Sequence, residues 1–287
     1  MDREIGVMEF RLGCELSYRL PQPTPVVFNL EVARTAIQIV RHETLTLTPD
    51  PGRETWLQPE SGNRYLRVVA PAGAFTLRYE ATVSLAPGLD DPAAIAEVPA
   101  GELPFEVYPH LYPSRYCQAD RLTPFAQRTF GALPGGYARV NGICNWIHDH
   151  VDYRAGSSDA QSSAMDTILD RAGVCRDFAH LAIACCRAMG IPARYVSAYA
   201  WRLDPPDFHA VFEAWLQGPN GGAWYIFDAT RKAAPNGLVR IRIGRDAAEV
   251  AFASPFGSFE AEPPRVWIEA LGEADGPITT AAVRVEG

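Results

Sequence analysis

The stretch RAGVCRDFAHLAIACCRAMGIPARYVSAYA, residues 171–200, decides the fold of this chain. Residues 175–189 are largely apolar and are followed by Gly190 and Pro192, a pair that is typical of a helix end. Residues 193–203 are then expected to form a β-strand. The stretch therefore predicts a buried helix that leads into a strand, with a cysteine in the first turn of the helix.

That cysteine, Cys175, is a candidate nucleophile. Gly173 permits a tight turn into the helix, and the unpaired N–H groups and the helix dipole of the first turn favour a negative charge. A thiolate held in such a place can react at neutral pH. The alternative interpretation is packing, because cysteine is often a small buried hydrophobe. We expect that role for the other cysteines, which are Cys14, Cys117, Cys144, Cys185 and Cys186.

A cysteine nucleophile needs a base, and the base needs an orienting group. Two predicted strands, HAVFEAWL (209–216) and WYIFDAT (224–230), form a hairpin through the turn GPNGG (218–222). The first strand begins with His209 and the second carries Asp228. The remaining histidines are not expected beside the thiol, because they lie on the far side of the helix or on other elements; they are His42, His110, His148, His150 and His180.

The register of the hairpin tests the pairing of these two residues. If Gln217 lies opposite Gly222, His209 faces Thr230, and Asp228 is its diagonal neighbour on the same sheet face. Diagonal neighbours lie roughly 7–8 Å apart at Cα, within side-chain reach. A slip of one residue would place the two side chains on opposite faces. The spacing permits the pair, and an aspartate inside a strand is unfavourable without a partner.

The rest of the chain predicts an α+β protein with two domains. Segments with period-two alternation and turns between them predict an N-terminal β-sandwich-like domain over residues 1–100. A proline-rich linker covers residues 101–120, and residues 121–287 form the core with a C-terminal extension. Helices are expected at 123–131, 137–150, 162–171 and 175–189, and the strands of an antiparallel sheet follow them, the last one at 238–243.

Composition excludes several classes of protein. The 287 residues carry a formal net charge of −8, which does not favour binding to nucleic acid. The sequence contains no run of 18 apolar residues, so no membrane span is expected. The six cysteines form no C-x-x-C pair, so neither a zinc site nor a disulfide framework is expected. The N-terminus has no apolar segment typical of a secretory signal. We expect a cytoplasmic protein without a metal or an organic cofactor.

Three motifs carry a resemblance to a known family. GVCRDFAHL (173–181), DFHAVFEAWL (207–216) and WYIFDAT (224–230), in this order, resemble the transglutaminase-like superfamily. Within it, the chain is similar to bacterial transglutaminase-like cysteine proteases, which carry a β-rich domain before the core. YPSRYCQAD (112–120) and GRDAAEVAF (244–252) extend the similarity. The resemblance implies a papain-like core, with helices packed on an antiparallel sheet.

The resemblance also implies a chemistry and its residues. Cys175 matches the nucleophile, His209 the base and Asp228 the orienting residue of an amide or peptide hydrolase that acts through a thioester. The backbone N–H of Cys175 is one expected oxyanion donor, and Tyr153 or Asn145 is a candidate for the second. The expected substrate is a peptide or protein amide. Two alternatives stay open: a transglutaminase that transfers amines, and a binding scaffold without catalysis.

Amine transfer has less support in the sequence. Arg176 stands where animal transglutaminases carry a tryptophan, and no calcium-binding loop is recognisable.

Overall fold

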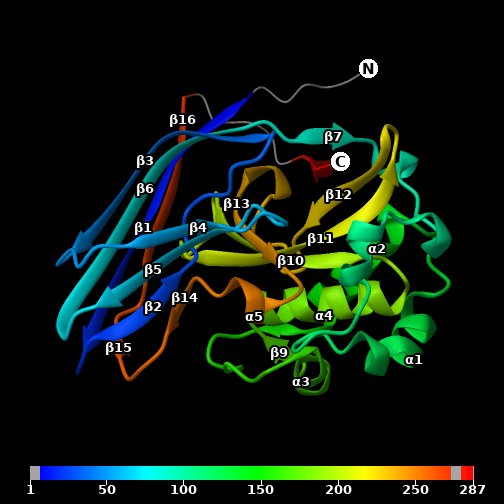
Figure 1. The fold of residues 1–287 in the computed structure, drawn as a ribbon. Coiled ribbons are helices and arrows are strands. Elements are labelled where there is room, and N and C mark those ends of the chain that lie inside the picture. Colours follow the sequence, from blue (N-terminus) through cyan, green and yellow to red (C-terminus); the bar gives the residue numbers. More distant parts are fainter. Residues whose placement is uncertain (1–6, 273–278, 287) are drawn as a thin grey trace.

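The structure is a computed structural model that describes residues 7–272 and 279–286. A strand-rich part, which contains the N-terminal strands, lies beside a part in which helices cover a second sheet (Figure 1). The α+β class predicted from the sequence is confirmed.

The strand-rich part is a sandwich of two antiparallel sheets. β1 lies at the centre of the larger sheet, paired with β6 on one side and with β15 and β16 on the other, and β3 follows β6. The smaller sheet has the order β14-β2-β5-β4. Alternate side chains of β1 and β6 are buried, as in Leu16 and Leu77, which face each other across the pair. Its first six strands are β1 (Met8–Leu20), β2 (Thr24–Phe28), β3 (Gln38–Thr48), β4 (Glu54–Leu57), β5 (Arg64–Ala70) and β6 (Gly73–Leu85).

Three late strands return to this sandwich. β14 (Ala253–Pro255) pairs with β2, whereas β15 (Glu260–Ala261) and β16 (Arg265–Leu271) pair with β1. From the sequence, these strands are expected to belong to a C-terminal extension of the core. Pairing between strands that lie more than 200 residues apart has no local pattern in the sequence. These three strands connect the sandwich to the core. They also place the residues between α5 and β16 beside the site described below.

The core sheet is antiparallel and has the order β13-β10-β11-β12-β17-β7. Its outer strand β7 comes from the residues that precede the expected linker, and the linker itself contains short 3₁₀ helices, η2 and η3, in place of an extended connection. The strands are β7 (Gly88–Asp90), β10 (Ala193–Ala200), β11 (Phe208–Gly218), β12 (Gly221–Phe227), β13 (Leu238–Gly244) and β17 (Ala282–Glu286). The 3₁₀ helices are η1 (Pro92–Ala94), η2 (Ala100–Glu102), η3 (Phe105–His110) and η4 (Pro235–Gly237).

Helix α4 is the central element of the core. It packs on β10 and β11 and is covered by α1, α2 and α3, so that nearly all of its side chains are buried. Small side chains allow this close packing, and buried Arg187 ties the end of the helix to the carbonyl groups of Ala193, Tyr112 and Arg245. The helices are α1 (Ala119–Phe130), α2 (Tyr137–His150), α3 (Ala164–Asp170), α4 (Cys175–Ala188) and α5 (Ala247–Val250). The first residue of α4 is therefore held on a rigid support.

Two findings concern the expected helices and membrane spans. The helix expected at 123–131 begins earlier, at Ala119, and Pro124 lies inside it. No helix in residues 7–272 and 279–286 combines the length and apolar character that are needed to cross a bilayer.

Candidate active site

Cys175 begins α4 and lies at the surface of a pocket. Its side chain is partly exposed, whereas the five other cysteines are buried, and all six are free thiols. The carbonyl of Val174 accepts hydrogen bonds from the backbone N–H groups of Asp177 (2.9 Å) and Phe178 (3.1 Å). In return, Asp177 Oδ2 accepts from the Val174 N–H at 2.9 Å and from the Ser158 hydroxyl at 2.5 Å. The fully buried Asp177 carboxylate thus fixes the turn that presents the thiol.

Gly173 is required by close packing, and not by a tight turn as the sequence suggested. It forms β9 (Ala172–Gly173), which pairs with β8 (Asp152–Tyr153), and its φ angle is not among the positive values of the chain. A Cβ atom added at Gly173 would lie 2.6 Å from the Cβ atom of Asp177. The absent side chain therefore lets Asp177 reach the turn before Cys175.

His209 and Asp228 form a buried pair. His209 Nε2 lies 3.0 Å from Asp228 Oδ2, and the two residues are 2% and 1% exposed. The register predicted for the hairpin is confirmed, because Gln217 lies opposite Gly222 and Phe212 opposite Phe227.

The second strand ends earlier than expected, at Phe227, so Asp228 lies just beyond the sheet. Its Oδ1 atom accepts from the Thr230 N–H (2.8 Å) and the Thr230 hydroxyl (2.7 Å), and its Oδ2 atom accepts from the Ala233 N–H (2.9 Å). An aspartate that bonds to backbone groups further along the chain favours a turn over a strand. The carboxylate therefore shapes its own loop and also orients the imidazole of His209.

The electrostatics of His209 link it to both neighbours. Burial lowers the pKa of His209, but hydrogen bonds to Asp228 and Cys175 outweigh this effect and raise the pKa to about 10. Burial raises the pKa of Asp228, and the bonds from His209, Thr230 and Ala233 overcome it, so the net direction is downward. At neutral pH the pair is an imidazolium and a carboxylate.

The second ring nitrogen of His209, Nδ1, is the one that Asp228 leaves available to Cys175. Nδ1 forms no hydrogen bond of regular geometry within the described part of the chain, yet the thiol contributes to the raised pKa of the ring. The contact is thus looser than a regular hydrogen bond. Such a loose contact is common in enzymes without substrate.

Tyr153 is the second polar group beside the thiol. Burial and the negative charge of Cys175 raise the pKa of the Tyr153 hydroxyl, and its interaction with the Cys175 backbone N–H acts in the opposite direction. The Lys232 ammonium lies 4.4 Å from the centre of the Tyr153 ring. Asn145, the other oxyanion candidate from the sequence, instead accepts from Arg231 Nη2 at 2.5 Å. The structure therefore brings Tyr153 to Cys175 and engages Asn145 elsewhere.

Cys175 and His209 line a pocket of about 520 Å³. The N-terminal end of α4, the start of β11 and the segment between α5 and β16 form its walls. Its apolar lining includes Phe208, Val250, Phe252 and Pro264. Arg176 and Asp207 add charge, and burial raises the pKa of Asp207. In the described part of the chain, no three His, Cys, Asp or Glu side chains converge as a metal site requires.

Sequence reasoning missed the supporting groups of this site. Asp177 and Ser158 are separated by 19 positions, and their hydrogen bond depends on how the loop before α3 folds back. The Asp at the third helical position was a visible signal, because it is typical of a helix start. His180 is buried in the core, where its Nε2 atom accepts the Ala247 N–H at 3.1 Å.

Comparison with known proteins places the chain in a family. A crystal structure described as a "putative cysteine protease" from Cytophaga hutchinsonii is 39% identical over the whole of both chains, with a TM-score of 0.93. Residues 123–229 match the transglutaminase-like superfamily, and residues 8–106 match the N-terminal domain of bacterial transglutaminases. The chain belongs to the transglutaminase-like superfamily.

Two mycobacterial proteins without an assigned function are also similar to this transglutaminase-like chain. A Mycobacterium tuberculosis protein is 28% identical over 72% of this chain and 73% of its own length. A Mycobacterium leprae protein is 36% identical over 120 residues, which cover 39% of this chain and 42% of that protein. The segment matched to the superfamily, 123–229, contains Cys175, His209 and Asp228.

Proposed function

We propose that this protein is a cysteine-dependent hydrolase of amide or peptide bonds, with Cys175 as nucleophile, His209 as base and acid, and Asp228 as the residue that orients the base. One observation carries the proposal. His209 interacts both with a carboxylate bonded to its Nε2 atom and with the partly exposed thiol of Cys175, at the wall of a pocket. Similarity to a protein that is described as a putative cysteine protease supports the same function.

The reaction would begin with attack of the Cys175 sulfur on the carbonyl carbon of the substrate. The proton of the thiol is held by Nδ1 of His209, and it passes to the nitrogen of the leaving amine when the C–N bond breaks. A thioester remains on Cys175. His209 then takes a proton from water, which attacks the thioester and releases the acid together with the free thiol. Asp228 keeps Nε2–H oriented throughout and accepts no proton.

The developing oxyanion needs donors beside the sulfur. The backbone N–H of Cys175 lies at the N-terminal end of α4, where the helix leaves N–H groups without helical partners. The Tyr153 hydroxyl is next to both this N–H and the thiol. Together they would supply two donors, and each such donor typically contributes a factor of about 10²–10³ in rate.

The substrate is a peptide or protein amide in this proposal. The apolar lining of the pocket favours an aromatic or aliphatic side chain next to the scissile bond, because burial of that side chain against Phe208 and Phe252 excludes water. The exposed Asp207, which also lines the pocket, disfavours an acidic side chain at the same place.

A substrate screen tests the function. Fluorogenic peptides with a phenylalanine, leucine, glutamine or glutamate residue before the amide are incubated with the protein and with its Cys175→Ala variant. The proposal predicts product with the native protein, faster for the apolar residues, and none with the variant. Added primary amine that becomes incorporated into the product would instead favour amine transfer. Equal turnover by native protein and variant would contradict the role of Cys175.

A further inference from the structure

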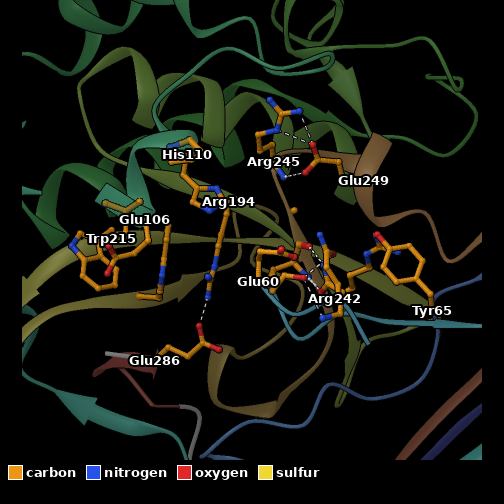
Figure 2. Close-up of a pocket in the computed structure, with 18 residues that line it drawn as sticks. Glu60, Tyr65, Glu106, His110, Arg194, Trp215, Arg242, Arg245, Glu249 and Glu286 are labelled. Carbon is orange, nitrogen blue, oxygen red and sulfur yellow. Dashed lines mark hydrogen bonds and ion pairs between the residues drawn. The ribbon is translucent and has the colours of Figure 1, made fainter. Parts of the chain in front are cut away.

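A second pocket, of about 820 Å³, lies apart from Cys175. The hairpin between β4 and β5, the helix η3, residues 245–249 at α5 and five strands of the core sheet form its walls (Figure 2). It shares no lining residue with the pocket of Cys175 and His209. Ligand binding here would therefore be separate from the proposed hydrolysis.

Most charges in this pocket are neutralised by partners. Arg194 bonds Glu286 at 2.6 Å and the fully buried Glu213 at 2.5 Å, and Arg245 bonds Glu249 at 2.7 Å; Figure 2 shows the pairs Arg194–Glu286 and Arg245–Glu249. These ion pairs leave little net charge on this part of the wall.

Arg242 is different, because it is a buried cation without a carboxylate partner. Its residue is 4% exposed, and it forms no ion pair within residues 7–272 and 279–286. It donates through Nη2 to the Tyr65 hydroxyl, and its Cζ atom lies 3.8 Å from the centre of the Tyr65 ring. Its Nε–H has no hydrogen-bond partner among the residues that the structure describes. A guanidinium removed from water without an anion is costly, so a site of this kind is suited to receive one.

The pKa of Arg242 is consistent with a buried guanidinium that has no carboxylate partner among the described residues. Burial lowers the pKa of the guanidinium, and only Tyr65 and the charge of Glu249 act against it. The group stays protonated, since arginine does not lose its proton in proteins. Glu249 is itself bonded to Arg245.

Two further polar atoms of residues that line the pocket have no hydrogen-bond partner in the described part of the chain. They are Trp215 Nε1, which is a hydrogen-bond donor, and His110 Nδ1. Burial and the nearby arginines lower the pKa of His110 to about 3, so its ring is neutral at physiological pH. The Trp224 ring is 4% exposed, because the Arg194 guanidinium lies over it with Cζ 4.0 Å from the ring centre, whereas Trp215 is partly exposed. The pocket thus combines one uncompensated cation with the aromatic surface of Trp215.

We propose that this pocket binds the carboxylate of an amino acid or a short peptide, with Arg242 as the anchoring residue and the Trp215 ring as the surface for an apolar side chain. A carboxylate matches the geometry of the planar guanidinium. Its single negative charge would supply the counter-charge that Arg242 lacks. Glu60 and Glu106, which are exposed residues at the same pocket, favour a ligand that also carries an ammonium group. They disfavour a dianion such as phosphate.

The test is direct binding of three dipeptides. Calorimetry measures the affinity for Gly-Phe, its C-terminal amide and its N-acetyl form, with inorganic phosphate as a fourth probe. The Cys175→Ala protein is used, so that no peptide can be cleaved and the result does not depend on the proposed function. We expect saturable binding of Gly-Phe, at least tenfold weaker binding of the amide, a smaller loss for the acetylated form, and phosphate binding weaker than that of Gly-Phe.

Three variants identify the anchor. Arg242→Met should abolish the difference between acid and amide, and Arg242→Lys should keep part of it because the charge remains. Arg245→Gln, which removes a cation already paired with Glu249, should change the affinity for Gly-Phe less than threefold. Without ligand, Arg242→Met should be at least as resistant to heat as the native protein, which separates lost binding from lost folding.

Clear results would overturn the proposal. These are the absence of saturable Gly-Phe binding, equal affinity for acid and amide, tighter binding of phosphate, or unchanged Gly-Phe binding by a folded Arg242→Met variant.

Discussion

Replacing Asp228 by asparagine changes one atom of the carboxylate and keeps its shape. In the native protein Oδ1 accepts two hydrogen bonds from Thr230, and Oδ2 accepts from His209 and Ala233. An asparagine that keeps its oxygen toward Thr230 turns its NH₂ group against the donors of His209 and Ala233. The opposite orientation turns the NH₂ group against the Thr230 N–H. Either orientation leaves buried donors without acceptors, at about 1–3 kcal/mol for each.

The loss of charge adds a dependence on pH. The pKa of His209 is about 10 in the folded protein, against 6.5 for an unperturbed histidine. This difference corresponds to about 5 kcal/mol, to which both Asp228 and Cys175 contribute. Burial is already the largest single effect on His209, and without Asp228 only Cys175 opposes it, so the pKa of His209 falls. We therefore expect the variant to lose about 3–5 kcal/mol of unfolding free energy near pH 6.

The sign of the pH dependence follows from the two shifts. A raised histidine pKa stabilises the fold fully below about pH 6.5, and this contribution disappears as the pH rises toward 10. A lowered aspartate pKa stabilises the fold above the usual value of 3.8 and is lost as the pH falls below it. The difference between native protein and Asp228→Asn should be largest between about pH 4 and 6.5 and should narrow toward pH 10.

Denaturation by guanidinium chloride at pH 5.5, 7.5 and 9.5, followed by tryptophan fluorescence, measures this difference. Asp207→Asn is the matched control. Asp207 lines the same pocket but is an exposed residue, so its replacement should change the unfolding free energy by no more than about 0.5 kcal/mol at any of the three pH values. Peptide hydrolysis by Asp228→Asn should fall by about 10⁴-fold. A difference in stability that stays constant from pH 5.5 to 9.5, or an active variant, would refute the reasoning.

Three other predictions concern the neighbours of the thiol. Burial raises the pKa of Cys14, Cys117 and Cys144 to about 12 from 9.0, so iodoacetamide at pH 7.5 should label Cys175 first in the folded protein, and mass spectrometry that finds another cysteine labelled first would contradict this. Tyr153→Phe should lower kcat about 100-fold without altering the melting temperature; full activity would remove Tyr153 as an oxyanion donor. Gly173→Ala should cost about 1–3 kcal/mol in chemical denaturation, because its Cβ atom would lie 2.6 Å from Asp177; unchanged stability would show that the turn can relax.

The parts of the fold that the sequence predicted are those set by local pattern. The helix expected at 137–150 forms over Tyr137–His150, because its apolar stripe and its flanking residues are local signals. The hairpin register depends only on a short turn, and so it could be predicted together with the proximity of His209 and Asp228. The catalytic roles of these residues and the cytoplasmic location stay predictions.

What the sequence could not predict depends on distant contacts. The pairing of β16 with β1 joins segments with no shared local pattern. The choice between Tyr153 and Asn145 depended on the path of the loop after α2, which carries Tyr153 to the first residue of α4. Arg242 is another example, because a strand arginine is usually exposed, whereas this one is buried and packs on Tyr65, a residue 177 positions away.

Asp177 and Asp228 are buried aspartates, and each stabilises a turn beside one of the two reacting groups. Asp177 accepts the Val174 N–H and fixes the turn that presents Cys175, whereas Asp228 accepts the N–H groups of Thr230 and Ala233 and fixes the turn that faces His209. Asp177 lies in the first turn of α4 and Asp228 in the loop after β12, and each accepts hydrogen bonds from backbone N–H groups. The distance between sulfur and imidazole therefore depends on two turns, each of which is stabilised by its own carboxylate. Because α4 and the hairpin are packed against each other, displacing either turn should separate the reacting groups without unfolding the core.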